Sequence, residues 1–315
     1  MTPAPALPAV RPCRRILRRI LLALAATVVL LALAAAIVYV ASERRLQRDY
    51  AVAPRVSAPD PSLAGEGSRL ARSRGCADCH GDDFGGRVIA DEMPFARLVG
   101  PGLARRSDRE SAQDVHRRLS AALHHGVDAA SSPLLMMPSL EFSNLSRREV
   151  EALSAYFAGL PPMARALPDS RLGPLGRTLL VAGKLEGFLS AEVIDHRREA
   201  VEAPPPLGTL AYGRHAAQLC TGCHQADFAG GPTSHGGPGM PPAANLTPDA
   251  SGLGAWSERD FIAAMRTGRR PDGSAIDGRA MPWRAVGSAG DEELRSIWLY
   301  LRSLPPVKRG ARAAR

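Results

Sequence analysis

The stretch CADCH at Cys76–His80 recurs as CTGCH at Cys220–His224. In each pentapeptide, two cysteines are separated by two residues and are followed at once by a histidine. This spacing is typical of covalent attachment of a c-type haem. Two thiols add across the two vinyl groups of the porphyrin, and the histidine then lies under the iron as an axial ligand. The sequence therefore predicts two haems c, with thioether cysteines Cys76, Cys79, Cys220 and Cys223 and axial histidines His80 and His224.

Other interpretations of the two pentapeptides are weaker. A redox-active C-x-x-C pair does not need the histidine and does not explain its recurrence. A zinc site needs four ligands at one place, whereas the two motifs lie 144 residues apart. By composition, chance recurrence has a probability on the order of one in a million. The fifth cysteine, Cys13, stands alone before an apolar run, and we interpret it as a bystander thiol.

The same offset of 144 residues identifies candidates for the second axial ligand. Met137 and Met281 each lie 57 residues after their motif histidine, and each precedes a proline. Further matched pairs are Asp83-Phe84 with Asp227-Phe228, Tyr156 with Tyr300, and Leu160–Pro162 with Leu304–Pro306. The chain is thus a tandem duplication. We expect His/Met ligation, the usual pair for electron transfer, at both irons.

The other methionines and histidines fit the ligand position less well. Met136 is adjacent to Met137, but its counterpart in the second unit is Ala280. Met93 also precedes a proline, yet it lies only 13 residues after His80. The remaining alternatives have no regular relation to the motifs: Met240, Met265, His116, His124, His125, His196 and His235.

An uncharged run of 22 residues, Ile20–Ala41, precedes both units. As a helix it would span roughly 33 Å, close to the thickness of a bilayer core. Five arginines before it favour a cytoplasmic N-terminus. We expect an uncleaved single-pass anchor in a bacterial inner membrane, with the haem domains in the periplasm. A cleaved signal peptide is the alternative, although its apolar region usually has only about 7–15 residues.

Apolar residues at helical spacing predict an all-α fold. Helices are expected over 63–75 and 208–219, before the motifs, and at the end of each unit, from a capping box at Ser146 and from Asp291. No strand-like alternation is evident, and a short helix around Leu180 is expected to dock between the domains. The predicted segments are a cytoplasmic basic segment (1–19), a transmembrane helix (20–41), a linker (42–62), domain 1 (63–162), an interdomain linker (163–207), domain 2 (208–307) and a basic tail (308–315).

The net charge of +9 belongs to the two ends of the chain. Residues 1–48 carry +7 and residues 308–315 carry +4, which leaves 49–307 at −2. Because the body is close to neutral, nucleic acid is not an expected partner.

Several further stretches resemble a known family. They are LLMMPS (Leu134–Ser139), LSRREVEALSAYFAGLPP (Leu145–Pro162), GPLGRTLL (Gly173–Leu180), IDH (Ile194–His196), ANLTPDASGLGAWSERDFIAAMRTGRRPDG (Ala244–Gly273), MPW (Met281–Trp283) and YLRSLPPV (Tyr300–Val307). With both pentapeptides, roughly residues 63–307 resemble a membrane-anchored dihaem cytochrome c of class I fold. The closer resemblance is to the multihaem cytochrome c subunits of bacterial periplasmic alcohol, aldehyde and related dehydrogenases. It implies two tandem class I cytochrome c domains after one N-terminal transmembrane helix. The chain departs from those subunits in the number of cytochrome c units, which is three in them and two here.

The resemblance also implies how the axial histidines are oriented. In class I cytochromes a proline carbonyl often accepts a hydrogen bond from the axial histidine. The sequence Gly100–Leu103 resembles that loop for His80. At the corresponding place in the second unit, Ala244–Leu246 contains no proline, so the acceptor for His224 stays open.

These features predict an electron carrier and not an enzyme, because two six-coordinate irons leave no open position for a substrate. We expect the donor to be a periplasmic dehydrogenase or a quinol-oxidising complex. The expected acceptor is a terminal oxidase or a soluble cytochrome. One alternative is a dihaem subunit of a cb-type terminal oxidase, which also has an anchor followed by two c domains. The other is a dihaem peroxidase, in which one iron would lose its methionine.

Overall fold

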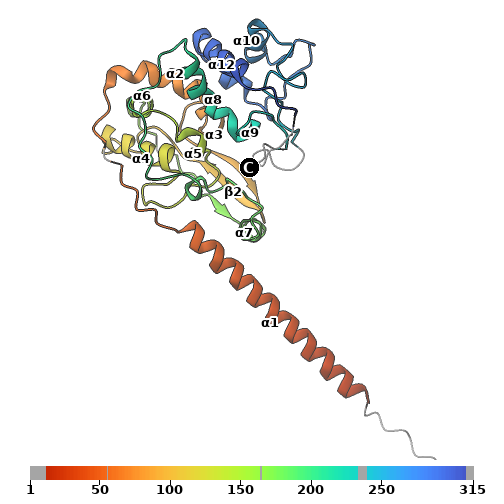
Figure 1. Cartoon of the computed structure of the whole chain (residues 1–315). Helices are drawn as coiled ribbons and strands as arrows, with labels where there is room; N and C mark the ends of the chain where they lie inside the picture. Colours follow the sequence, from red (N-terminus) through yellow and green to blue (C-terminus); the bar gives the residue numbers. More distant parts are fainter. Residues whose placement is uncertain (1–11, 55, 164, 233–239, 310–315) are drawn as a thin grey trace, which may run out of the picture.

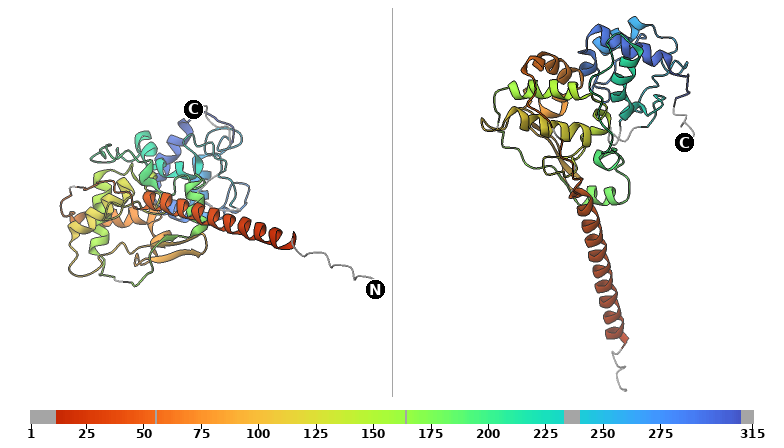
Figure 2. Two further views of the ribbon diagram at one scale, coloured as in Figure 1. Left: turned by 90° about the horizontal axis from the view of Figure 1, so that it is seen from below. Right: turned by 60° about the vertical axis from the view of Figure 1, so that its left-hand side comes forward.

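The computed structural model describes residues 12–309, apart from residues 55, 164 and 233–239. His235, residues 1–11, the side chain of Cys13 and the tail 310–315 lie outside what is described. A long helix, α1 (Pro12–Leu46), projects away from a body in which two helical units lie side by side (Figures 1 and 2).

The first unit is built on two crossing helices, α2 (Ala64–Ser73) and α6 (Arg147–Gly159). Helix α6 begins at the predicted capping box, with Ser146 as its N-cap. The crossing is so close that a Cβ atom on Gly67 would lie 1.9 Å from the carbonyl oxygen of Ala152. The other helices of this unit are η1 (Pro61–Leu63), α3 (Cys76–His80), α4 (Ala112–His125) and α5 (Ser139–Phe142).

The second unit repeats this arrangement with α8 (Leu210–Ala217) and α12 (Asp291–Ser303). Gly213 takes the place of Gly67, since its Cβ atom would lie 1.8 Å from the carbonyl oxygen of Ser296. The helices predicted before the motifs and at the end of each unit are therefore confirmed. The other helices are η3 (Gln218–Cys220), α9 (Thr221–His224), α10 (Glu258–Thr267) and α11 (Trp283–Gly287).

Each unit has its own apolar core. The first core includes Leu70, Phe84, Val115, Leu119, Val150, Leu153 and Phe157. The second core includes Phe228, Phe261, Leu294, Ile297, Trp298 and Leu301. The apolar stripes of α6 and α12 therefore face the interior, as their helical spacing predicts.

A three-stranded antiparallel sheet in the first unit corrects the all-α prediction. Its strands are β1 (Arg87–Glu92), β2 (Ala96–Gly100) and β3 (Arg171–Leu172), and β2 lies in the middle. Alternate residues of β2 are buried, but β1 is largely exposed and shifts register between Val88 and Ala90. A register shift erases the period-two pattern by which a strand is recognised in a sequence.

The linker helix α7 (Pro174–Val181) is present, but it does not dock between the two units. Leu180 is 1% exposed and belongs to a separate apolar cluster under the sheet. The other buried members of this sheet cluster are Ala96, Leu98, Leu172 and Leu189. The linker also contributes β3 and η2 (Ser190–Glu192), so it covers the sheet of the first unit.

Among the described residues, only α1 is long and apolar enough to cross a membrane, over Arg14–Leu46 with a mean hydropathy of 2.9. Its most apolar window is not buried against the rest of the protein. The C-terminal end of the helix forms two ion pairs with the linker. Arg177 of α7 lies 2.6 Å from Glu43, and Arg45 lies 2.6 Å from Glu192 of η2.

Candidate haem-binding sites

The first attachment motif forms the short helix α3. Gly75, with a φ of 70°, precedes it in the left-handed conformation that favours glycine. Cys76 and Cys79 are free thiols and are partly buried. Burial raises the pKa of Cys76 to about 12 and also raises the pKa of Cys79. Burial thus favours the neutral thiol form of both cysteines.

The loop after β2 orients the imidazole of His80. Its Nδ1 atom lies 2.7 Å from the carbonyl oxygen of Pro101, the predicted acceptor. Because a carbonyl only accepts, Nδ1 carries the proton and the Nε2 lone pair is free for a metal. Burial lowers the pKa of His80, which favours the neutral ring that binds iron. Gly100 permits this approach, since a Cβ atom there would lie 2.0 Å from the carbonyl oxygen of Cys79.

The structure identifies the hydrogen-bond acceptor for His224, which the sequence left open. The Nδ1 atom of His224 lies 2.7 Å from the carbonyl oxygen of Ala244. The acceptor is a backbone atom, so no proline is needed to provide it. Burial lowers the pKa of His224 as well. Gly230, with a φ of 70°, allows the close approach, because a Cβ atom there would lie 2.4 Å from the Ala244 oxygen.

Each candidate methionine faces the same core as a cysteine of its own motif. Met137 and Cys76 both pack against the core of the first unit. Met281 and Cys220 both pack against the core of the second unit. The prolines that follow the two methionines have nearly the same backbone angles, with φ and ψ of −78° and 54° in the first unit and −75° and 56° in the second. These side chains fit haem c. The two thiols suit the thioether links to the porphyrin, and the imidazole nitrogen and the methionine sulfur suit the iron.

The alternative ligands occupy other surroundings. Met136 packs against the sheet cluster and not against the core of the first unit. Met93 lies between β1 and β2 and is 45% exposed. Met265 is a buried residue of the second core. Three described histidines contact other groups: His116 the carbonyl of Ser57, His124 the carbonyl of Leu145, and His125 the ring of His196.

The two candidate sites lie against each other, which sequence reasoning did not foresee. Helix α11, which follows Met281, contacts α2 of the first unit, and α5, which follows Met137, contacts η3 of the second. The approach is close, because a Cβ atom on Gly222 would lie 2.7 Å from the carboxylate of Glu141. The segment after each candidate methionine thus packs beside the helix that leads into or begins the attachment motif of the other unit.

Comparison with known proteins agrees with this geometry. The Cytochrome c family profile matches residues 64–161 and 210–305. The chain is 26% identical over 279 residues to the cytochrome c subunit of a quinone-dependent alcohol dehydrogenase from Gluconacetobacter polyoxogenes, covering 79% of this chain and 57% of that protein. It is 28% identical over 269 residues to the gluconate 2-dehydrogenase cytochrome c subunit of Pantoea cypripedii, covering 77% and 60%. Identity to the fructose dehydrogenase cytochrome subunit of Gluconobacter japonicus is 25% over 277 residues, covering 79% and 54%.

The chain therefore spans little more than half the length of these relatives. Each relative is named as the cytochrome subunit of a dehydrogenase and not as its catalytic subunit. The two matched ranges together cover most of this chain. The chain belongs to the cytochrome c family, as an electron-transport protein whose two family domains imply covalently bound haem c.

Proposed function

We propose that the chain binds two haems c and passes electrons between them as a membrane-anchored subunit of a respiratory electron-transfer complex. The observation that carries this proposal is the contact between the two sites, in which α5 packs on η3 and α11 packs on α2. Two redox centres whose binding segments touch need no diffusion step to exchange an electron.

Each residue of the proposed sites has a defined role. Cys76 and Cys79 would hold one haem through thioether bonds. His80 would ligate its iron, and the Nδ1–H bond of His80 to the Pro101 carbonyl fixes the ring and its tautomer. Met137 would be the second protein ligand of the same iron, and no position would then be left for a substrate. When bound, haem supplies reversible one-electron exchange at its iron. In the second site these roles fall to Cys220, Cys223, His224 and Met281, with the Ala244 carbonyl as acceptor.

Helix α1 is proposed as the anchor, with its N-terminal arginines in the cytoplasm. Covalent haem c is attached outside the cytoplasm, and both motifs follow this one apolar helix. An inside N-terminus then puts both haem domains in the periplasm. The ion pairs of Arg45 and Arg177 support this arrangement, because they hold the domains against the end of the helix.

The proposed donor is a periplasmic dehydrogenase. The relatives are named as cytochrome subunits of dehydrogenases, and the proposed topology puts the haem domains in the periplasm. A quinol-oxidising complex is the alternative donor, and a terminal oxidase or a soluble cytochrome is the proposed acceptor. The cb-type oxidase subunit remains a second candidate function, since it shares the order of anchor and two c domains. The alternative of a dihaem peroxidase has less support, because each methionine packs against the core of its own unit, as one cysteine of its motif does.

Two measurements test the proposal. The intact mass of the chain, produced with haem-attachment machinery, should exceed that of the polypeptide by two haems. A Cys76→Ala/Cys79→Ala double variant should carry one haem, and a wild-type mass with one haem or none would contradict the proposal. Affinity purification from native membranes should then recover a dehydrogenase. Recovery of oxidase subunits in its place would favour the cb-type alternative.

A further inference from the structure

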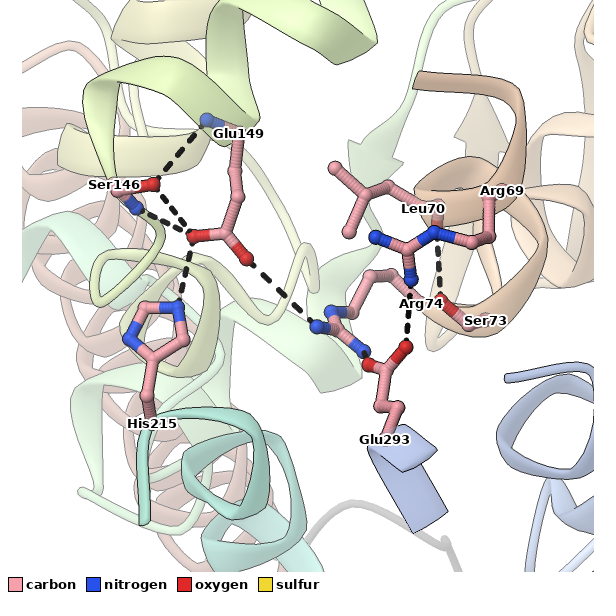
Figure 3. Close-up of polar contacts among 8 residues, drawn as sticks. All are labelled: Arg69, Leu70, Ser73, Arg74, Ser146, Glu149, His215 and Glu293. Atoms are coloured by element: carbon pink, nitrogen blue, oxygen red, sulfur yellow. Dashed lines mark hydrogen bonds and ion pairs between the residues drawn. The ribbon is translucent and has the colours of Figure 1, made fainter. Parts of the chain in front are cut away.

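Two ion pairs cross the interface between the units in a reciprocal way (Figure 3). His215 of α8 lies 2.8 Å from Glu149 of α6, and Arg69 of α2 lies 2.6 Å from Glu293 of α12. The two glutamates are 144 residues apart, and each is the third residue of the last helix of its unit. Each unit therefore offers a glutamate to the motif-leading helix of the other, so the units are related by an approximate two-fold arrangement.

A single arginine breaks this symmetry. The Nη1 atom of Arg74 lies 2.6 Å from Glu293, and its Nη2 atom lies 3.8 Å from Glu149 (Figure 3). The three side chains are only 6%, 1% and 2% exposed. The offset of 144 residues places Gln218, which is uncharged, at the matching position of the second unit. One buried cation is thus held by one glutamate from each unit.

Arg74 lies between the two attachment motifs. It precedes Cys76 by two residues, and its charge opposes the rise that burial produces in the pKa of both Cys76 and Cys220. It also lines a crevice between the units together with Glu141, His215 and Leu219. The same guanidinium therefore faces the cysteine region of both sites.

Arg74 keeps its charge in this position. Burial alone would lower its pKa, but the charges of Glu293 and Glu149 and a hydrogen bond to Glu293 outweigh burial and raise it. A buried charge is screened by salt much less than a surface charge. Reduction adds one electron to a haem, so a nearby fixed cation stabilises the reduced form over the oxidised form.

We propose that Arg74 couples the two haem sites electrostatically and raises the reduction potential of both haems together. This inference rests on the proposed function, because it requires a haem at each motif. The glutamates hold the guanidinium at the interface and moderate its effect, and their removal should therefore act in the opposite direction.

The test is a redox titration of the purified, detergent-solubilised full chain with soluble mediators, in which each haem takes one electron. In Arg74→Gln, both steps should move to lower potential. The equilibrium constant for reduction by a given mediator should fall about tenfold per haem, the order of size expected from a nearby unit charge at the effective dielectric of about 20 that suits protein sites. Arg74→Lys, which keeps the charge, should stay close to wild type. Glu293→Gln should move both steps to higher potential, which keeps the test informative where Arg74→Gln does not fold.

Arg118 provides the matched control. It is another largely buried arginine, with its side chain 12% exposed, and it pairs with Glu110 within the first unit. Its charge acts on His80 of the first site, and its ion pair stays within the first unit. Arg118→Gln should therefore shift one step of the titration and leave the other in place.

The outcomes separate this inference from the proposed function. A variant Arg74→Gln with two haems in its mass but with one step or neither shifted would overturn the coupling and leave the proposed function intact. A wild-type chain with fewer than two haems would overturn the proposed function itself. Loss of domain association in Arg74→Gln without a change of either potential would assign Arg74 a structural role only.

Discussion

Gly67 of α2 packs directly on the backbone of Ala152 in α6, where a Cβ atom would lie 1.9 Å from the carbonyl oxygen. Gly213 and Ser296 repeat this relationship at 1.8 Å in the second unit. Because the obstacle is backbone and not a flexible side chain, a methyl group can be accommodated only if the helices move apart. These glycines thus set the spacing of the helix pair that supports each motif.

We predict that Gly67→Ala lowers the free energy of unfolding of the first unit by at least about 2 kcal/mol, toward the upper end of overpacking effects. Denaturant unfolding followed by circular dichroism measures it. Gly65→Ala, in the same helix, is the control, because a Cβ atom there has no neighbour within 4 Å. It should change stability by no more than about 1 kcal/mol and in the stabilising direction. Equal stability of the two variants would show that the helices are not in contact at Gly67.

The internal repeat predicts the matched residues of the two units, but a fixed offset does not find every matched residue. The 144-residue offset locates Met137 and Met281, and it also relates Glu149 to Glu293, a signal that sequence reasoning did not use. The glycines Gly67 and Gly213 are 146 residues apart, because the first unit has two more residues between its helix and its motif. A search at a fixed offset therefore misses them.

The sheet and the buried ion network could not be predicted, for physical reasons. Strand β3 has only two residues, and it pairs with β2 across about 75 residues of chain, so it has no local signature. The position of Arg74 depends on how the two units pack together. Sequence periodicity identifies only the residues that face the core of each unit, so it does not predict this position. From the sequence alone, Arg74 would be predicted to lie on the surface, because arginine is mostly exposed in proteins.

The stability of the interface should depend on pH through Glu149. Burial raises the pKa of this carboxyl group, but the hydrogen bond and charge of His215, with Arg74 and the Ser146 backbone, outweigh burial and lower it to about 2, from an ordinary value of 4.5. A depressed pKa means that the contribution is complete above pH 4.5 and is lost as the pH falls toward 2. Linkage puts its size at about 3 kcal/mol.

We therefore predict that wild type and Glu149→Gln differ clearly in unfolding free energy at pH 6 and that the difference shrinks by pH 3. Urea denaturation at the two pH values measures it. Asp114, the acid of the exposed capping box of α4, is the control. Asp114→Asn should differ little from wild type at either pH, because the Asp114 side chain is solvent-exposed. A difference for Glu149→Gln that is the same at both pH values would contradict the assignment.

The axial methionines can be tested one unit at a time. Met137→Ala should abolish the weak long-wavelength sulfur-to-iron absorption band of the first haem and lower its reduction potential, because the axial ligand sets the potential. Met281→Ala should do the same for the second haem. Met136→Ala is the neighbouring control, since Met136 packs against the sheet cluster, and it should retain the band. Loss of the band in Met136→Ala but not in Met137→Ala would exchange their roles.

The assignment of α1 as an uncleaved membrane anchor can be tested by fractionation and by the N-terminal residue of the mature chain. If α1 spans the membrane uncleaved, the native chain should stay with membranes through a high-salt wash and should still begin near Met1. Replacing residues 1–41 with a cleavable signal peptide should release a soluble periplasmic protein that carries its haem. The deletion removes the contact of Arg177 with the ring of Tyr39. The contacts of Glu43, Arg45 and Leu46 with the body should persist, because these residues lie after the deleted segment. Recovery of the native chain as a soluble species that starts after residue 36 would identify the apolar run as a signal peptide.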